Sequence, residues 1–210
     1  MITVFGGIKG GSGKTTLATN LVELHSRKKK VLLVDADEQK SASDWVEQRV
    51  SQNIKTDWTS VQLCGKTMYA QLSKFRNDYD DIIVDVGGRD TTSQRAALAV
   101  ADRFIIPFKP RSFDVWTIGP LKVLIEEMKA VNPKLVCYAI INQGDAKGID
   151  NEEAKKILAN YSIFECLDVV IGNRKSFGNA AAEGKSIFEI QNLDKKAQNE
   201  FIKFYKKIYN

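Results

Sequence analysis

Apolar residues in this chain gather in short continuous runs that alternate with stretches of helical periodicity. Continuous apolar runs of about four to eight residues are typical of parallel strands that are buried on both faces. Strands are expected at residues 2–5, 31–34, 59–63, 81–85, 103–107, 135–141 and 164–171, the last as one strand or two. Helices are expected from residue 17 to a basic run at 27–30, and at residues 41–50, 67–75, 91–101, 118–131, 151–158 and 195–210. The alternation predicts an α/β fold with one doubly wound, mainly parallel sheet of seven to eight strands flanked by helices, in a single domain over residues 1–210.

A glycine-rich segment at residues 6–16 follows the first strand and precedes the helical pattern that begins at Leu17. A strand, a glycine-rich turn and a helix N-terminus in this order form a phosphate-binding loop, because backbone N–H groups and the helix dipole converge on one anion. In such a loop the Lys14 ammonium reaches the β- and γ-phosphates and the Thr15 hydroxyl ligates Mg²⁺. The candidate phosphate-binding residues are Gly10, Gly11, Ser12, Gly13, Lys14, Thr15 and Thr16.

The spacing of this loop departs from the strict P-loop pattern at one position, where Ile8 replaces the first glycine. A second lysine, Lys9, stands five positions before Lys14. Together these features resemble the deviant Walker A motif of the ParA/MinD P-loop ATPases, and most closely the small plasmid-partition ParA proteins of the ParF type. The resemblance implies that ATP or ADP binds with Mg²⁺. It also implies that Lys9 reaches across a dimer interface to the nucleotide of the partner subunit.

Three aspartates follow buried strands, at the sheet edge where an open α/β sheet binds its ligands. By the same resemblance, Asp37 orients the attacking water and Asp35 lies nearer the Mg²⁺ shell, while Asp85 is the Walker B acid that holds Mg²⁺ through a water. The catalytic residues are therefore expected to be Lys9, Lys14 and Asp37, and the metal-binding residues Thr15, Asp35 and Asp85. Glu38 stands where the family usually has proline, which leaves the geometry of this turn open.

The residues after Asp85 and at the end of the strand at 135–141 complete the expected site. Gly87 and Gly88 let the backbone approach the γ-phosphate, as a switch II loop does. Arg89 has three open roles: it clamps phosphate, contacts a partner subunit or pairs with Asp90. The resemblance assigns Asn142 to an adenine edge, whereas without it Asn142 is a turn residue.

Two basic segments are candidates for contacts with nucleic acid. Lys109 and Arg111, in a proline-containing loop, face phosphate or DNA, or form a solvated loop; Ser112 is expected to cap the next helix. Arg174 and Lys175 belong to a segment similar to one that contributes basic residues for DNA in the family, and the alternative is ordinary surface charge.

The last helical pattern places apolar residues on one face and lysines mostly away from it. A helix docked on the sheet is favoured over a membrane-surface helix of the MinD kind. The lone His25 and Trp45 are interpreted as helix-surface or packing residues.

Composition says little about the function, but it argues against several classes of protein and of metal site. Among 210 residues, 43% are hydrophobic, and 31 basic against 26 acidic residues give a net charge of +5. Cys64, Cys137 and Cys166 are far apart, so a disulfide framework or a thiolate metal site is not indicated and they are expected to be small core residues. The sequence shows neither a signal peptide nor a membrane span, so we expect a cytoplasmic protein. The resemblance implies in addition that it is bacterial or plasmid-encoded and nucleoid-associated.

The resemblance as a whole implies a DNA partition ATPase that hydrolyses ATP slowly to ADP and phosphate. It implies an ATP-dependent homodimer, with higher-order assembly left open, that binds DNA non-specifically and is stimulated by a centromere-binding adaptor. Two other classes are kept: a MinD-like membrane-associated regulator of cell division, and a P-loop metabolic or carrier relative.

Overall fold

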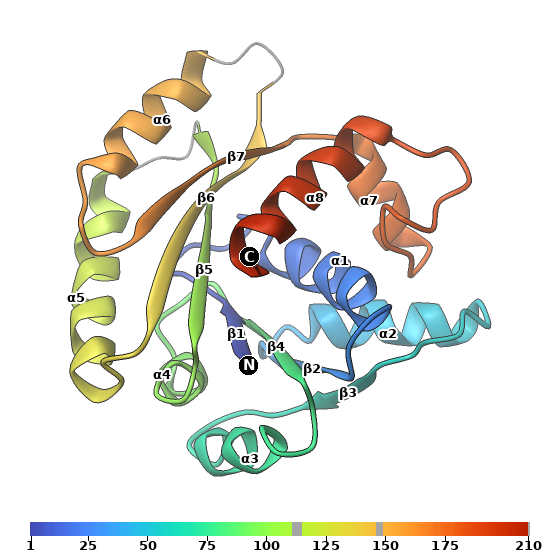
Figure 1. Ribbon diagram of the computed structural model, residues 1–210, viewed down its shortest axis with the longest axis horizontal. Coiled ribbons are helices and arrows are strands. Elements are labelled where there is room, and N and C mark those ends of the chain that lie inside the picture. Colours follow the sequence, from blue (N-terminus) through green and yellow to red (C-terminus); the bar gives the residue numbers. More distant parts are fainter. Residues whose placement is uncertain (111–114, 146–148, 210) are drawn as a thin grey trace.

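The computed structural model describes residues 1–110, 115–145 and 149–209, with the side chains of residues 115–117 excepted. Seven strands form one parallel sheet in the order β3-β2-β4-β1-β5-β6-β7 (Figure 1). They are β1 Ile2–Phe5, β2 Val31–Ala36, β3 Thr59–Gln62, β4 Asp81–Val86, β5 Arg103–Phe108, β6 Val136–Gly144 and β7 Glu165–Gly172. The strands β2 to β4 lie on one side of β1 and the strands β5 to β7 on the other, so the predicted doubly wound parallel sheet is confirmed.

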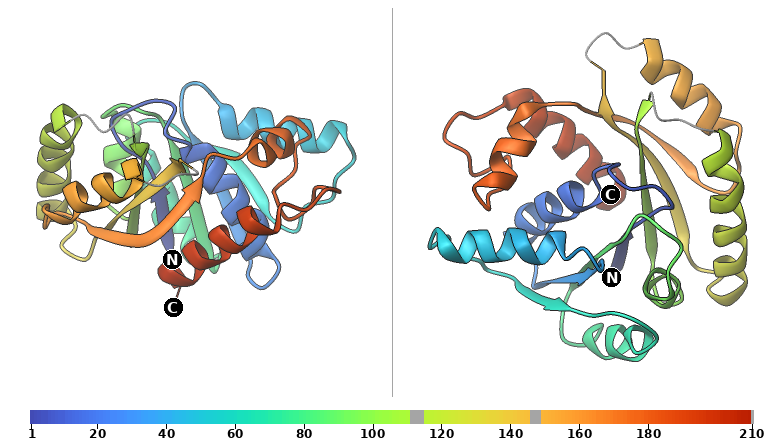
Figure 2. Two further views of the ribbon diagram at one scale, coloured as in Figure 1. Left: turned by 90° about the horizontal axis from the view of Figure 1, so that it is seen from above. Right: turned by 180° about the vertical axis from the view of Figure 1, so that it is seen from behind.

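Helices cover both faces of this sheet (Figures 1 and 2). One face carries α1 Lys14–Ser26, α2 Ser41–Ser51, α7 Lys175–Ala182 and α8 Lys195–Tyr209. The other carries α3 Met68–Phe75, α4 Thr92–Leu98, α5 Val115–Val131 and α6 Ile149–Ala159. Along β4, Ile82 and Val84 belong to the second core and Ile83 to the first, because successive side chains of a strand point to opposite faces. This two-sided burial explains the continuous apolar runs.

Several boundaries differ from those expected. The first helix begins at Lys14 instead of Leu17, because Gly13 in a left-handed conformation (φ 87°) ends the loop and starts the helix. The strand β6 continues to Gly144, three residues past the expected end, and residues 165–172 form one strand. The expected cap Ser112 and the basic residue Arg111 lie outside the described residues.

The terminal helix α8 is docked on the protein, as predicted. Its apolar side chains Ala197, Phe201, Phe204 and Ile208 are all buried against the sheet and α1. Among the described residues, no helix has both the length and the apolar character needed to cross a membrane.

The cysteine prediction is wrong at one position. Cys137 is buried and Cys166 is partly buried, but Cys64 is exposed. Cys64 follows the edge strand β3, whose outer side has no neighbouring strand to cover it. Leu63 before it still packs against the core, whereas the Cys64 side chain is exposed. His25, in contrast, is a packing residue that bonds Asp81 and Tyr205 at 2.9 Å each.

Candidate nucleotide-binding site

A cleft of about 900 Å³ opens at the carboxyl ends of β1, β2 and β4. Three segments far apart in the sequence line it: the loop at 10–16, the turn at 36–41 and the turn at 87–91. One wall is formed by the side of α2 with Asp44, Trp45 and Gln48. The cleft thus joins the glycine-rich loop, Asp37 and the Gly87-Gly88 turn, as the sequence predicted.

The glycine-rich loop is shaped by two left-handed glycines and by its own lysine. Gly11 (φ 72°) and Gly13 (φ 87°) adopt conformations that disfavour other residues. Gly13 also caps α1 without a side-chain hydrogen bond, which leaves the first N–H groups of the helix available to an anion. The Lys14 ammonium is buried within the loop and donates a hydrogen bond to the Lys9 carbonyl at 3.1 Å.

Two amide side chains at the end of β6 hold the phosphate loop in place. The Asn142 amide donates to the Ser12 carbonyl at 2.7 Å, and the Gln143 amide donates to the Gly11 carbonyl at 3.1 Å. A Cβ on Gly13 would overlap the Asn142 amide, so the two pack directly. Asn142 therefore braces the phosphate loop in this structure, and its expected contact with adenine stays a prediction. Gln143, in a left-handed conformation (φ 57°), was not expected from the sequence.

Asp85 stands near the end of β4, two residues before the turn that lines the cleft, and is completely buried. Burial raises its pKa to about 7, against the opposing effects of the Thr15 hydroxyl and the Lys14 ammonium. Neither of its oxygens accepts a hydrogen bond of normal geometry from the described residues, although the Thr15 hydroxyl is close enough to lower the pKa. The pKa of Lys14 is lowered by burial, with Asp85 and Asp37 opposing that shift. The end of β4 thus places a buried carboxylate close to the Thr15 hydroxyl and the Lys14 ammonium.

The side-chain oxygens of Asp85 and Thr15 suit a magnesium ion. Mg²⁺ prefers oxygen ligands and is commonly held by one or two protein groups together with phosphate oxygens and waters. A buried carboxylate beside a hydroxyl offers such a set in Asp85 and Thr15. Among the described residues, no group of three or more His, Cys, Asp or Glu side chains is placed to hold a metal ion.

The turn after β2 is held by Asp35. Its Oδ1 accepts the Asp37 N–H at 3.1 Å, and its Oδ2 accepts both the N–H and the hydroxyl of Ser43 at 2.7 and 2.6 Å. Asp35 thus fixes the start of α2 and the orientation of Asp37. Its expected position near the Mg²⁺ shell stays a prediction, and the bonds seen here give it a positioning role.

The turn after β4 lies against both other segments. A Cβ added to Gly87 would lie 3.0 Å from the Asp37 carboxylate, and one added to Gly88 would lie 2.6 Å from the Gly10 nitrogen. Only glycine fits at Gly88 without displacing the phosphate loop. The structure therefore packs this turn against the backbone of the phosphate loop and against the Asp37 side chain.

The contacts of the residues after this turn narrow the three roles left open for Arg89. Asp90 pairs with Arg95, whose guanidinium lies 2.6 Å from its carboxylate, and Arg95 also pairs with Glu127. The described contacts thus give Asp90 another partner, and Arg89 is exposed at the lip of the cleft. Phosphate and a partner subunit remain its two open contacts.

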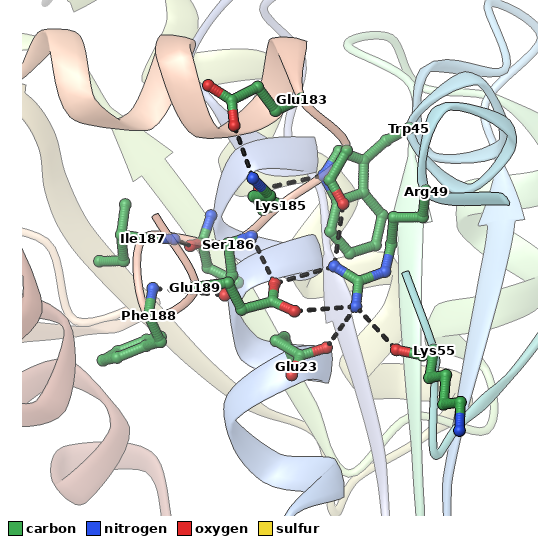
Figure 3. Close-up of polar contacts among 12 residues, drawn as sticks. Glu23, Trp45, Arg49, Lys55, Glu183, Lys185, Ser186, Ile187, Phe188 and Glu189 are labelled. Atoms are coloured by element: carbon green, nitrogen blue, oxygen red, sulfur yellow. Dashed lines mark hydrogen bonds and ion pairs between the residues drawn. The ribbon is translucent and has the colours of Figure 1, made fainter. Parts of the chain in front are cut away.

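A buried arginine anchors the α2 wall (Figure 3). The Arg49 guanidinium has no exposed side-chain surface and forms two hydrogen bonds to Glu189, at 2.8 and 3.0 Å, and one to Glu23 at 3.2 Å. It also donates to the carbonyls of Gly184 and Lys55 at 2.9 and 3.2 Å. Arg49 therefore links α2 to α1, to the segment before β3 and to the segment after α7.

Two tryptophans complete this anchor. Trp45 and Trp58 stack with ring centroids 5.6 Å apart, and the Arg49 guanidinium lies 5.0 Å from the first ring and 5.7 Å from the second. The Trp45 indole donates to the Lys185 carbonyl at 3.3 Å, so Trp45 packs as expected and also lines the cleft. Sequence reasoning missed Arg49; its position four residues after Trp45 on the same helix face was the available signal.

The second basic segment proposed for DNA is partly neutralised. Arg174 forms a two-point ion pair with Glu200, at 2.6 and 3.0 Å, and Glu200 also accepts the Gly172 N–H. Arg174 thus joins the start of α7 to α8. Lys175 beside it is exposed.

Comparisons with known proteins agree with this geometry. The chain is 32% identical over 187 residues to a maintenance of carboxysome distribution protein A from Gloeobacter kilaueensis, covering 86% of this chain and 81% of that protein. It is 25% identical over 203 residues to the protein of the same name from Halothiobacillus neapolitanus, covering 92% and 89%. A plasmid partition protein from Borrelia burgdorferi bound to AMPPNP has the same fold, with a TM-score of 0.75 at 21% identity and 98% of each chain covered.

The family model described as the CobQ/CobB/MinD/ParA nucleotide binding domain matches residues 3–187, which include the whole cleft floor and the α2 wall. This chain belongs to that family of P-loop nucleotide-binding proteins.

Proposed function

We propose that this chain is a ParA-type partition ATPase, which binds ATP as a dimer, attaches to DNA non-specifically and hydrolyses ATP slowly until a centromere-binding adaptor stimulates it. The observation that carries the proposal is the meeting of the phosphate loop, Asp37 and the Gly87-Gly88 turn in one cleft, with Gly88 against Gly10. A turn in backbone contact with the phosphate loop must respond to a γ-phosphate placed there, as switch segments do.

Different residues bind the phosphates, orient the attacking water and hold the metal ion. The loop N–H groups and the Lys14 ammonium bind the phosphates, and Asp37, held by Asp35, orients a water. Thr15 and Asp85 would hold Mg²⁺, which when bound neutralises charge on the phosphate oxygens. Lys9 is exposed on the loop that faces the cleft opening, where a second subunit would bring its own nucleotide.

Partition of DNA is supported by the two-lysine loop and by the likeness to a protein named for plasmid partition. A second candidate is the positioning of a protein compartment, because the two relatives compared above are named for carboxysome distribution. Loss of a test plasmid after deletion of the gene favours the first role. Altered placement of a compartment without plasmid loss favours the second.

A MinD-like role on membranes has less support in this fold. The apolar side chains of α8 are buried, so the helix would have to leave the sheet before it could enter a bilayer. Co-sedimentation with lipid vesicles that requires residues 195–210 would favour this alternative over partition.

The experiment that tests the proposal is DNA retention with ATP, with ADP and without nucleotide, each across a salt series. We expect much stronger retention of long DNA with ATP than with ADP or without nucleotide, and a steep loss with rising salt, because non-specific binding rests on phosphate contacts. Equal retention with ATP and ADP contradicts the switch.

A further inference from the structure

A group of basic side chains lies at the edge of the sheet opposite the nucleotide cleft. It combines the segment that follows α1 with the carboxyl-terminal half of α8, and every member is exposed. We call it the α1–α8 basic surface, and its residues are Arg27, Lys28, Lys29, Lys30, Lys203, Lys206 and Lys207. In Figure 2, left, both chain termini mark this edge, and the loop after β1 lies at the opposite edge.

Direct contacts hold the two parts of this surface together. Near the end of α1, the His25 ring accepts or donates a hydrogen bond with the Tyr205 hydroxyl at 2.9 Å and stacks on Tyr209 at 4.2 Å. The Arg27 guanidinium lies 5.6 Å from the ring of Phe188. The ends of α1 and α8 are therefore fixed side by side, and their cations form one surface.

The charge of this surface is left uncompensated. Within the described part of the chain, none of its seven side chains forms an ion pair within 4.0 Å, whereas Arg76, Arg95 and Arg174 elsewhere all do. The seven are part of 31 basic residues, and the other 24 are fewer than the 26 acidic residues. The seven cations of this surface thus exceed the net charge of +5 of the whole chain, and the remaining charged residues are slightly acidic in sum.

The acidic groups beside it are already engaged. Glu23, which the charge of Arg27 reaches, accepts hydrogen bonds from Arg49 and Trp58. Asp80 accepts the Lys30 N–H at 2.8 Å, and Lys29 contributes to lowering its pKa after that hydrogen bond. Asp168 pairs with Lys155 at 2.9 Å and has Lys207 as a more distant charge. None of these carboxylates closes the surface to an external anion.

We propose that the α1–α8 basic surface binds the phosphate backbone of double-stranded DNA; this inference rests on the DNA-binding function proposed above. The exposed face of α8 offers lysines while its apolar residues are buried, which suits a polyanion and not insertion into a lipid bilayer. A helix of 15 residues is about 22 Å long. At about 3.4 Å per base pair this length follows roughly six base pairs.

The position of the surface has a consequence for the role of ATP. Each protomer carries the complete surface, at the edge away from the cleft, so nucleotide does not build it. A dimer that forms through the cleft presents two copies, and two linked weak sites bind a long DNA far more tightly than one. ATP thus strengthens attachment by pairing two surfaces.

The test compares two variants that remove the same charge. In the surface variant, four lysines are changed to glutamine: Lys28, Lys29, Lys206 and Lys207. In the control variant, four exposed lysines on other elements are changed to glutamine: Lys66, Lys74, Lys134 and Lys156. Basal ATP hydrolysis, measured on both, checks that the fold and the cleft are intact.

With ATP and a long plasmid fragment, we expect the surface variant to lose at least about 10-fold in affinity. The slope of log K against log salt should fall by about 7 units, since the dimer presents two copies of the four lysines and each phosphate contact contributes about 0.9. The control variant should stay within about 3-fold of wild type. Wild-type affinity in the surface variant, or equal losses in both variants, overturns the proposal.

A short duplex tests the second part of the proposal. A duplex of about 10 base pairs spans little more than one surface, so at low salt the ATP and ADP states should bind it equally, whereas ATP should favour the long fragment. A preference for ATP on the short duplex, or no binding to it, overturns the claim that each protomer carries a complete site.

The remaining outcomes separate the partner and the underlying function. If the four lysines are needed for binding to phosphatidylglycerol vesicles but not to DNA, the surface is a membrane site and the proposal fails. If wild-type protein retains no DNA in any nucleotide state, the proposed function fails. If wild type and the surface variant retain DNA equally, only the present inference fails.

Discussion

Replacing Arg49 by methionine should destabilise the protein by about 3 kcal/mol. Arg49 is completely buried, and its removal leaves Glu189 and Glu23, whose side chains are 19% and 14% exposed, without their cation. Breaking a buried ion pair by removing one partner typically costs about 3 to 5 kcal/mol. The partial exposure of both glutamates places the expected value at the lower end of that range.

The pH dependence gives this prediction a second readout. Burial acts to raise the pKa of Glu189, but the hydrogen bonds from Arg49 and Ser186 outweigh it and lower the pKa overall. In wild type this carboxylate stabilises the fold above its unfolded pKa, and that contribution is lost as pH falls through the folded pKa. Without Arg49, burial dominates and the pKa of Glu189 rises. The variant should therefore recover stability relative to wild type as pH falls through the raised pKa of this carboxylate, where it takes up a proton.

Glu23 changes the pH dependence of the stability of the variant in the same direction as Glu189. Burial, and after it the charge of Glu189, raise its pKa even in wild type, so its ionised form already opposes folding above that pKa. Loss of the Arg49 charge raises the pKa of Glu23 further. Both glutamates thus make the Arg49→Met defect larger at high pH than at low pH.

Urea unfolding followed by circular dichroism measures the free energies, and Arg76→Met is the matched control. Arg76 pairs with Asp102 at the surface, where its side chain is 40% exposed. An exposed pair is worth about 0 to 1 kcal/mol, so this control should change stability by less than 1 kcal/mol. A loss from Arg49→Met no larger than that of the control, or a defect that grows as pH falls, refutes the reasoning.

Three further changes address the cleft. Lys9→Ala should keep most nucleotide binding but lose ATP-dependent dimerisation and hydrolysis, as measured by light scattering and phosphate release; turnover at the wild-type rate would remove the role across the dimer. Asp37→Ala should trap the ATP-bound dimer because the water is no longer oriented, and light scattering that shows only monomer with ATP contradicts this. Gly88→Ala should weaken ATP binding at least about 10-fold, since a Cβ placed 2.6 Å from the Gly10 nitrogen must displace the phosphate loop. Gly178→Ala, where a Cβ meets nothing within 4 Å, is its control, and equal ATP affinity in the two variants refutes the steric argument.

The sequence by itself determined the architecture and the chemistry of the loop. Continuous apolar runs predicted strands that are buried on both faces. The order of a strand, a glycine-rich turn and a helix N-terminus predicted a phosphate loop with Lys14 and Thr15, whereas the role of Lys9 came from the family resemblance. Asp85 was located because the carboxyl ends of parallel strands share one edge, which is a property of the fold class and not of any one contact.

Only the tertiary structure decided which side chains support that site. Arg49 meets Glu189 across 140 residues and Asn142 meets Ser12 across 130, and no periodicity records such pairs because they depend on which helices and strands become neighbours. Asp35 holds the turn after β2 through the Asp37 and Ser43 donors, which only the folded turn brings to its oxygens. Local pattern sets burial and turn geometry, whereas the partner of a buried polar group is set by packing, and packing exists only once the sheet and its helices are assembled.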